Sequence, residues 1–121
     1  MAMVVGLSLA LVGILFVALV PIVPHPFSDE FAVLSRETLT LPVGSWVTGS
    51  WRAQPGDTLT FVVAPPGGSP AYQNTGTSAT FAFLATRATY DFFVSSVVSN
   101  HDAMLDRVFL NGTFMAPLLW S

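Results

Sequence analysis

Hydrophobic positions follow two different patterns, which meet near residue 24. Residues 1–23 contain no charged residue, Asn, Gln or His, and they are almost wholly Val, Leu, Ile, Ala, Phe and Gly. A helix needs about 20 apolar residues to cross a bilayer, so this stretch predicts a transmembrane helix. From Pro24 onward, apolar and polar residues alternate in short runs, which indicates half-buried β-strands.

The alternating runs predict seven or eight short strands separated by turn signals. A strand or strand pair is expected over 30–41, and further strands over 46–51, 58–63, 77–84, 89–94, 104–110 and 113–119, with at most a short strand at 71–73 inside a loop. The connections leave no room for crossover helices, which excludes a parallel sheet. We therefore expect an antiparallel β-sandwich of the jelly-roll or immunoglobulin-like kind, preceded by one amino-terminal transmembrane helix.

Turn residues set the expected ends of these strands. Gln54-Pro55-Gly56-Asp57 has Pro and Gly in the order that a type II turn requires, and the proline-rich stretch 64–74 predicts an exposed loop. A further turn is expected at 74–76. Asn111-Gly112 is typical of a type I′ hairpin. Gly49 indicates a possible bulge in its strand.

These patterns divide the chain into a transmembrane helix (1–23), a proline-rich spacer (24–29) and an extracytoplasmic β-sandwich (30–121). A cleaved signal peptide is disfavoured because no basic residue precedes Arg36 and no small-x-small site follows the apolar run. A pilin-like leader ending at Gly6 lacks the same basic residues. We expect a single-pass protein of the cell membrane, with the amino terminus cytoplasmic and the carboxy-terminal domain outside.

Small residues in the apolar stretch fall on one face of the predicted helix. Ala2, Gly6, Ala10 and Gly13 are spaced by four, four and three residues. Such a smooth face lets a second helix approach closely in lipid, although Gly and Ala are also common in membrane helices without a partner. The pattern favours helix packing through these four residues.

Composition narrows the possible partners. The net charge is −3, with four Arg and no Lys, so the chain cannot neutralise a row of phosphates and nucleic acid is excluded as a partner. The sequence has no Cys, which excludes disulfides and thiolate chemistry. So lightly charged a surface is poorly soluble when bare, and we expect other protein to cover much of it.

Candidate chemistry is sparse. His101, Asp102 and Asp106 are weak candidates for a metal site, because they place nitrogen and oxygen donors in one turn and the strand after it. A surface turn explains the same residues equally well. His25, between two prolines, is interpreted as a solvated spacer residue. No catalytic constellation and no cofactor or small-molecule site is expected, and we do not expect an enzyme.

Several apolar side chains are candidates for partner contacts. The two faces of the strand 46–51 assign Val47 and Trp51 to one side and Trp46 to the other, so one tryptophan is expected in the core. The carboxy-terminal tail is unusually apolar and is expected to be buried, either as an edge strand or against another subunit. The candidates for partner contact are Trp46, Phe114, Leu118, Leu119 and Trp120.

Residues 41–100 resemble the GOLD (emp24/p24-type) β-sandwich, in particular its small membrane-anchored prokaryotic members. The resemblance rests on Val43-Gly44-Ser45-Trp46, Pro55-Gly56-Asp57, Phe81-Ala82-Phe83 and Tyr90-Asp91-Phe92, in this order. It departs where Arg87-Ala88-Thr89 replaces a usual Gly, and in its amino-terminal anchor without a coiled coil. The resemblance implies a protein-binding sandwich without catalysis. Because of these departures, we do not assign to this chain the cargo-receptor function of the eukaryotic members.

The sequence therefore predicts a non-catalytic accessory or structural subunit of a larger membrane complex. Its expected partners are membrane lipid and other membrane subunits or copies of itself. One alternative is a subunit of a pilin-like extracellular filament or surface layer. A second alternative is a periplasmic metal-binding module that uses His101 and Asp102.

Overall fold

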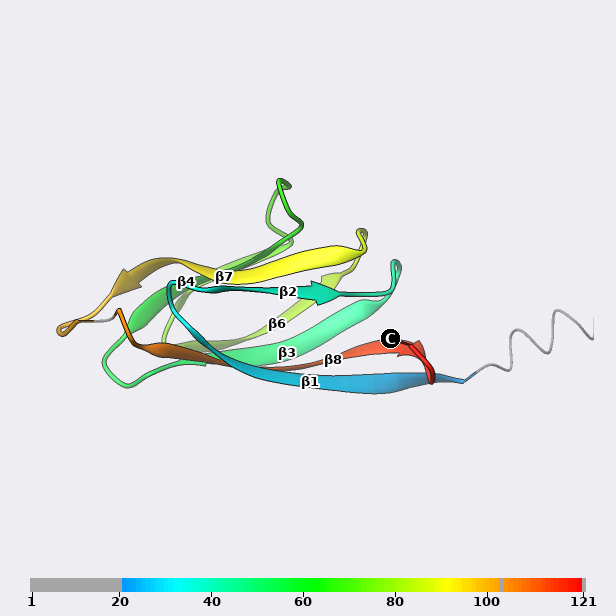
Figure 1. The fold of residues 1–121 in the computed structure, drawn as a ribbon, viewed down its shortest axis with the longest axis horizontal. Helices are drawn as coiled ribbons and strands as arrows, with labels where there is room; N and C mark the ends of the chain where they lie inside the picture. Colours follow the sequence, from blue (N-terminus) through cyan, green and yellow to red (C-terminus); the bar gives the residue numbers. More distant parts are fainter. Residues whose placement is uncertain (1–20, 103, 121) are drawn as a thin grey trace, which may run out of the picture.

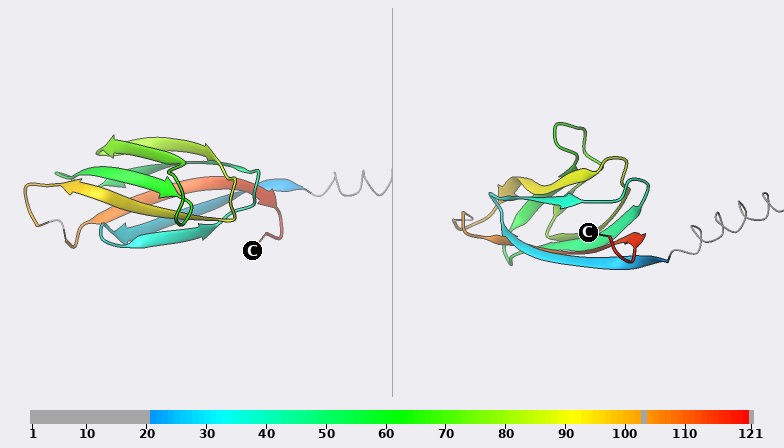
Figure 2. Two further views of the ribbon diagram at one scale, coloured as in Figure 1. Left: turned by 90° about the horizontal axis from the view of Figure 1, so that it is seen from above. Right: turned by 45° about the vertical axis from the view of Figure 1, so that its right-hand side comes forward.

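A computed structural model describes residues 21–102 and 104–120, which form eight strands in two layers (Figure 1). The strands are β1 (Ile22–Ala32), β2 (Arg36–Thr40), β3 (Trp46–Ala53), β4 (Thr58–Ala64), β5 (Tyr72–Gly76), β6 (Ser78–Leu84), β7 (Thr89–Val98) and β8 (Arg107–Pro117). Strands of both layers run along the same long axis (Figure 2). The proline-rich connection between β4 and β5 stands away from the sandwich, as the expected exposed loop does.

The strand order is that of a jelly roll. The first sheet has the order β1-β8-β3-β6 and the second has the order β2-β7-β4-β5. All neighbours are antiparallel, and β1 pairs with β8, β2 with β7, β3 with β6 and β4 with β5. The chain is thus one long hairpin folded over into two sheets. This confirms the predicted antiparallel sandwich, and its strand order is the jelly-roll alternative.

The sandwich has two ends with different connections. At the end that we call proximal, β1 and β3 begin and β8 ends. The first and last described residues therefore both lie at this end (Figure 1). The distal end carries the connections 33–35, 54–57 and 99–106. Residues that are far apart in the sequence therefore meet at each end.

The core consists of the side chains that alternate inward from both sheets. Val47 and Trp51 are fully buried, whereas Trp46 is 60% exposed, which confirms the predicted faces of β3. Trp51 stacks on Phe61 of the second sheet at 5.3 Å between ring centroids. The expected inward faces of β4, β6 and β7 are also buried, at Leu59, Phe61, Val63, Phe81, Phe83, Tyr90 and Phe92.

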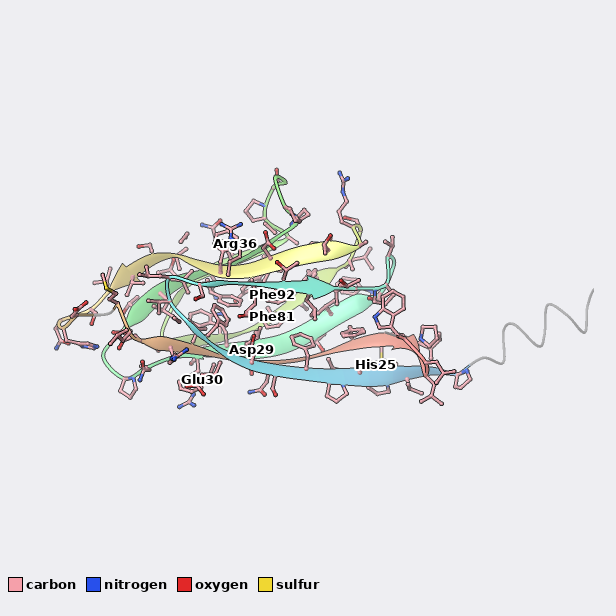
Figure 3. The ribbon with its side chains drawn as sticks, viewed as in Figure 1. His25, Asp29, Glu30, Arg36, Phe81 and Phe92 are labelled. Atoms are coloured by element: carbon pink, nitrogen blue, oxygen red, sulfur yellow. The ribbon has the colours of Figure 1, made fainter. Side chains whose placement is uncertain are left out.

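One row across the first sheet joins two phenylalanines through two glycines. Phe27 of β1 pairs with Gly112 of β8, which pairs with Gly49 of β3, which pairs with Phe81 of β6. A side chain at Gly112 would overlap the Phe27 ring, and one at Gly49 would overlap the Phe81 ring and the backbone of β8. Phe92 of the second sheet packs on both rings, at 6.1 Å from each, and Figure 3 shows it between the sheets with Phe81.

Three turn and bulge predictions are wrong, two of them because of this row. Asn111-Gly112 is not a hairpin but the middle of β8, paired on both sides, because Gly112 is needed beneath the Phe27 ring. Gly49 lies in a continuous register without a bulge, since its role is to admit the Phe81 ring. Residues 74–76 belong to β5, and the chain bends only after them. The type II turn at 54–57 is confirmed by the left-handed Gly56 (φ 92°) and the bond from Asp57 N–H to Gln54 O.

Residues 24–29 are extended, as expected, but they are not a separate spacer. They lie within β1 and pair with β8. Pro24 and Pro26 are two residues apart, so both lack an amide on the same side of the strand, and an edge strand accepts this where that side faces away from its partner. His25 is consequently not a solvated residue: it is half-buried, stacks on Phe114 at 5.3 Å and lies 2.9 Å from Pro117 O.

The predicted membrane helix falls almost entirely outside the described residues. Ala2, Gly6, Ala10 and Gly13 lie there, and helix packing through them stays a prediction. Within the described ranges, β1 already begins at Ile22, inside the expected span 1–23. The described part of the chain holds no helix long and apolar enough to span a bilayer.

Candidate functional site

Three titratable side chains converge at the distal end from two distant segments. Asp57 is the last residue of the type II turn and directly precedes β4, His101 lies in the β7–β8 connection, and Asp106 directly precedes β8. Their nearest ligand atoms all lie within 4.8 Å of one another. His101 Nε2 is 2.9 Å from Asp106 Oδ2 and 3.6 Å from Asp57 Oδ1. We call these three residues the distal cluster.

Asp57 is the unusual member of the distal cluster. Its side chain is fully buried, and neither carboxylate oxygen has a hydrogen-bond partner among the described residues. Buried polar groups are nearly always hydrogen-bonded, and a charge without a partner is costly to bury. His101 and Asp106 are more open, so the cluster reaches from solvent to a buried carboxylate.

The pKa values of the two carboxyl groups, Asp57 and Asp106, are shifted in opposite directions. Burial raises the pKa of Asp57, because it removes water from the charged form, and the neighbouring Asp106 carboxyl raises it further, whereas Ser99 and His101 lower it in part. The pKa of Asp106 is lowered, first by the Asp57 carboxyl and then by His101, which both stabilise its charged form. The protonated form is therefore favoured more strongly at Asp57 than at Asp106.

Hydrogen bonds orient the His101 ring toward the carboxylates. Its Nδ1 lies 2.9 Å from Ser99 Oγ and 3.2 Å from Asn100 Oδ1. An amide oxygen only accepts, so the bond to Asn100 requires a hydrogen on Nδ1. Nε2 faces Asp106 Oδ2 at 2.9 Å, where it donates a hydrogen when it carries one and offers its lone pair to a cation when it does not.

Sequence reasoning found two of the three members of the distal cluster. His101 and Asp106 come together as the weak metal candidates suggested. Asp102 does not join them, because its Oδ1 accepts the Met104 N–H and so caps the local turn. Asp57 was missed, since nothing local in the sequence relates it to residues more than 40 positions away. The available signal was an acid placed immediately before a buried strand.

The candidates for partner contact divide into two groups. Trp46, Leu118 and Leu119 are exposed at the proximal end, and Leu119 is 92% exposed. Phe114 is buried and is not free for a partner, whereas Trp120 is only partly buried against the core and its partner contact stays a prediction. The tail is therefore neither an edge strand nor wholly buried, because β8 is an inner strand between β1 and β3 and its last residues project beyond the sheet.

The exposed large apolar residues of the described chain gather at the two ends of the sandwich. The proximal group is Ile22, Val43, Trp46, Leu84, Met115, Leu118 and Leu119, and the distal group is Leu34, Val98, Met104 and Leu105. A shallow hollow of about 420 Å³ lies in the proximal group, lined by Ile22, the 42–46 turn and the end of β8. Exposed apolar clusters of this kind mark association surfaces.

Comparison with known proteins finds similar solved structures but no family. No protein-family model matches the sequence, and no curated protein matches it. The chain resembles a solved structure described as "Bacillus endospore appendages form a novel family of disulfide-linked pili", with a TM-score of 0.56 and 14% identity, over 80% of this chain and 88% of that one. At this identity the similarity concerns the fold, and the resemblance to GOLD domains stays a prediction.

Proposed function

We propose that this protein is a subunit of an extracellular filament, assembled from copies of the chain that meet end to end. The observation that carries the proposal is the gathering of exposed apolar side chains at opposite ends of a jelly roll, including Trp46 and Leu119 proximally and Leu105 distally. The similar appendage structure, which is a pilus, supports the same choice.

Two different surfaces at opposite ends favour an open assembly. A contact between the proximal end of one copy and the distal end of the next is heterologous, and such contacts form rings or open filaments rather than closed dimers. Burying apolar side chains at the contact stabilises it by about 25 cal/mol per Å². The low charge of the chain is consistent with a surface that is largely covered in its working state.

The proposed contact uses no disulfide. The similar pili are described as disulfide-linked, but this sequence contains no cysteine. Copies of this chain therefore depend on apolar burial and on hydrogen bonds between strands or turns. We expect filaments that dissociate in denaturant without any reducing agent.

Variants that remove one end at a time test the proposal. The proximal variant is Trp46→Ser with Leu119→Ser, and the distal variant is Leu34→Ser with Leu105→Ser. Each variant alone should stay monomeric by analytical ultracentrifugation, whereas the wild-type chain forms filaments visible by negative-stain electron microscopy. An equal mixture should stop at dimers, because each variant retains one intact end.

The matched control is Ala82→Ser, which changes an exposed residue in the middle of β6, away from both ends. It should assemble as the wild type does. A wild-type chain that stays monomeric at every concentration, or end variants that still elongate, would rule out end-to-end assembly.

The membrane-complex subunit expected from the sequence depends on the apolar stretch 1–23, most of which lies outside the described residues. Its single-pass topology, lipid contact and subunit partners stay predictions. Proteins that co-purify with the chain from its native membrane distinguish the two functions: a filament subunit brings copies of itself, whereas an accessory subunit brings different proteins.

A further inference from the structure

We propose that Asp57, His101 and Asp106 form a binding site for a divalent transition-metal ion, which joins the turn 54–57 to the connection 99–106 at the distal end. The metal site depends on polar side chains and the proposed filament contact on apolar ones, so the site does not depend on filament assembly.

The first argument is the state of the Asp57 carboxylate. It is fully buried and has no hydrogen-bond partner among the described residues, yet it lies beside the His101 ring and the Asp106 carboxylate. Placing a buried carboxylate this close to a second carboxylate is unfavourable unless a proton or a cation lies between them. A cation at this position would satisfy the oxygens that the fold leaves unpaired.

The second argument is the spacing of the donor atoms. Two ligands that each lie about 2.1 Å from an ion, at an angle of about 90–109°, are about 3.0–3.4 Å apart. His101 Nε2 is 2.9 Å from Asp106 Oδ2 and 3.6 Å from Asp57 Oδ1. These separations bracket the required value, so small side-chain rotations suffice to bring all three atoms onto one ion.

The third argument is the orientation of the imidazole. Histidines that bind metal ions usually donate their other ring N–H to a neighbouring oxygen, which fixes the tautomer. The contacts of His101 Nδ1 with Asn100 Oδ1 and Ser99 Oγ provide this support. Nε2 is left facing the carboxylates, as a ligand must be.

The donor set indicates which ions fit. One imidazole nitrogen and two carboxylate oxygens suit Zn²⁺ and Mn²⁺, whereas Ca²⁺ and Mg²⁺ prefer oxygen ligands throughout. Zn²⁺ should bind more tightly than Mn²⁺, following the usual order of affinities for such donors. His101 is 44% exposed, so water can complete the coordination.

Thermal unfolding of the untagged full-length chain, first stripped with a chelator, tests the site. Zn²⁺ at tenfold excess over its Kd should raise the melting midpoint by about 5 °C. Titration calorimetry should give one equivalent per chain. Asp57→Asn and His101→Gln should each weaken binding by roughly tenfold or more, whereas the matched control Asp102→Asn, in the same connection but outside the cluster, should bind as the wild type does.

Mn²⁺ gives a second readout that does not depend on stability. Its unpaired electrons should broaden the NMR signals of the His101 ring at low occupancy and leave those of His25, near the opposite end, unchanged. If neither ion shifts the melting midpoint, or if Asp57→Asn and His101→Gln bind like the wild type, the pair holds a shared proton and the proposal is wrong.

Discussion

Two buried carboxylates, Asp91 and Asp57, occupy opposite electrostatic situations in the same small sandwich. Asp91, on the outer face of β7, is bonded by Arg36 Nη1 at 3.1 Å and by Thr38 Oγ1 at 2.7 Å, both from β2. Asp57, at the distal end, has no hydrogen-bond partner among the described residues. Both are less than a tenth exposed, so burial alone does not explain the difference.

The difference separates a carboxylate that stabilises the fold from one that is available to a ligand. The partners of Asp91 come from the neighbouring strand, because Thr38 is its pairing residue and Arg36 lies two positions away. Asp57 ends a turn, where the sheet offers no cross-strand partner, and its near neighbours are a second acid and a histidine. The four predictions below test this contrast, from the largest expected effect to the smallest.

Asp91→Asn should cause the largest loss of stability. It removes the charge that Arg36 and Thr38 contact and places an amide group near the guanidinium, and hydrogen bonds to charged groups contribute about 1.5–3 kcal/mol. We expect the free energy of unfolding at pH 7 to fall by about 2 kcal/mol, measured by urea denaturation. The control Asp102→Asn, on the exposed distal connection, should change it far less.

Thr38→Val breaks one of the two contacts of Asp91 while keeping the shape of the side chain. The carboxylate keeps Arg36 but loses the hydroxyl donor, so the expected loss is about 1 kcal/mol. The paired variant with Asp91→Asn completes a double-mutant cycle. Additive losses in that cycle would show that the Thr38 hydroxyl does not act through Asp91.

In the presence of a chelator, Asp57→Asn should raise the free energy of unfolding, whereas Asp91→Asn lowers it. Removing a buried charge without a partner relieves its desolvation, so the metal-free protein should gain about 1 kcal/mol at pH 7. The same variant loses the stabilisation by Zn²⁺ proposed above. Glu30→Gln, an exposed acid on β1, is the control, and a destabilised Asp57→Asn would mean that its carboxylate is paired after all.

Glu37 is a third case, a partly exposed carboxyl group close to another acid, Asp29. A hydrogen bond to Asp29 raises its pKa, and burial and the Asp29 charge raise it further. A raised pKa favours the protonated form in the fold, so this contribution to stability is present below the ordinary pKa of 4.5 and is lost as the pH rises through the folded value.

Glu37→Gln should therefore stabilise the protein slightly at pH 7 and have no effect near pH 4. The variant keeps a hydrogen-bonding side chain in the small hollow of about 110 Å³ between β1 and β2. The measurement is the difference in melting midpoint from the wild type across this pH range. A constant difference would show that the effect of the substitution is not due to protonation.

The sequence was sufficient to predict those parts of the sandwich that depend on neighbouring residues in the chain. The Pro55-Gly56 pair predicts a turn that the structure confirms, and alternation in β3 separates buried Trp51 from exposed Trp46. The sequence-based prediction was wrong where a residue far away in the sequence determines the local structure. Asn111-Gly112 has the composition of a hairpin, but the ring of Phe27, more than 80 positions earlier, occupies the space above Gly112.

The candidate site shows the same limit. His101 and Asp106 are close in the sequence and could be proposed together, whereas Asp57 joins them only through the pairing of β4 with β7 and of β3 with β8. Asp102 has the right chemistry but serves its own turn. Residue type indicates which groups can act, and the strand order determines which of them meet.

The pairing of β1 with β8 has a consequence for how the molecule forms. The first described strand pairs with the last, and the paired residues are 75 to 95 positions apart in the sequence. Contacts so distant along the chain make folding slow, since the ends must find each other before the pairing is rewarded. A polypeptide still emerging from the ribosome cannot close its sandwich, so the first described strand lacks its partner until β8 has been synthesised.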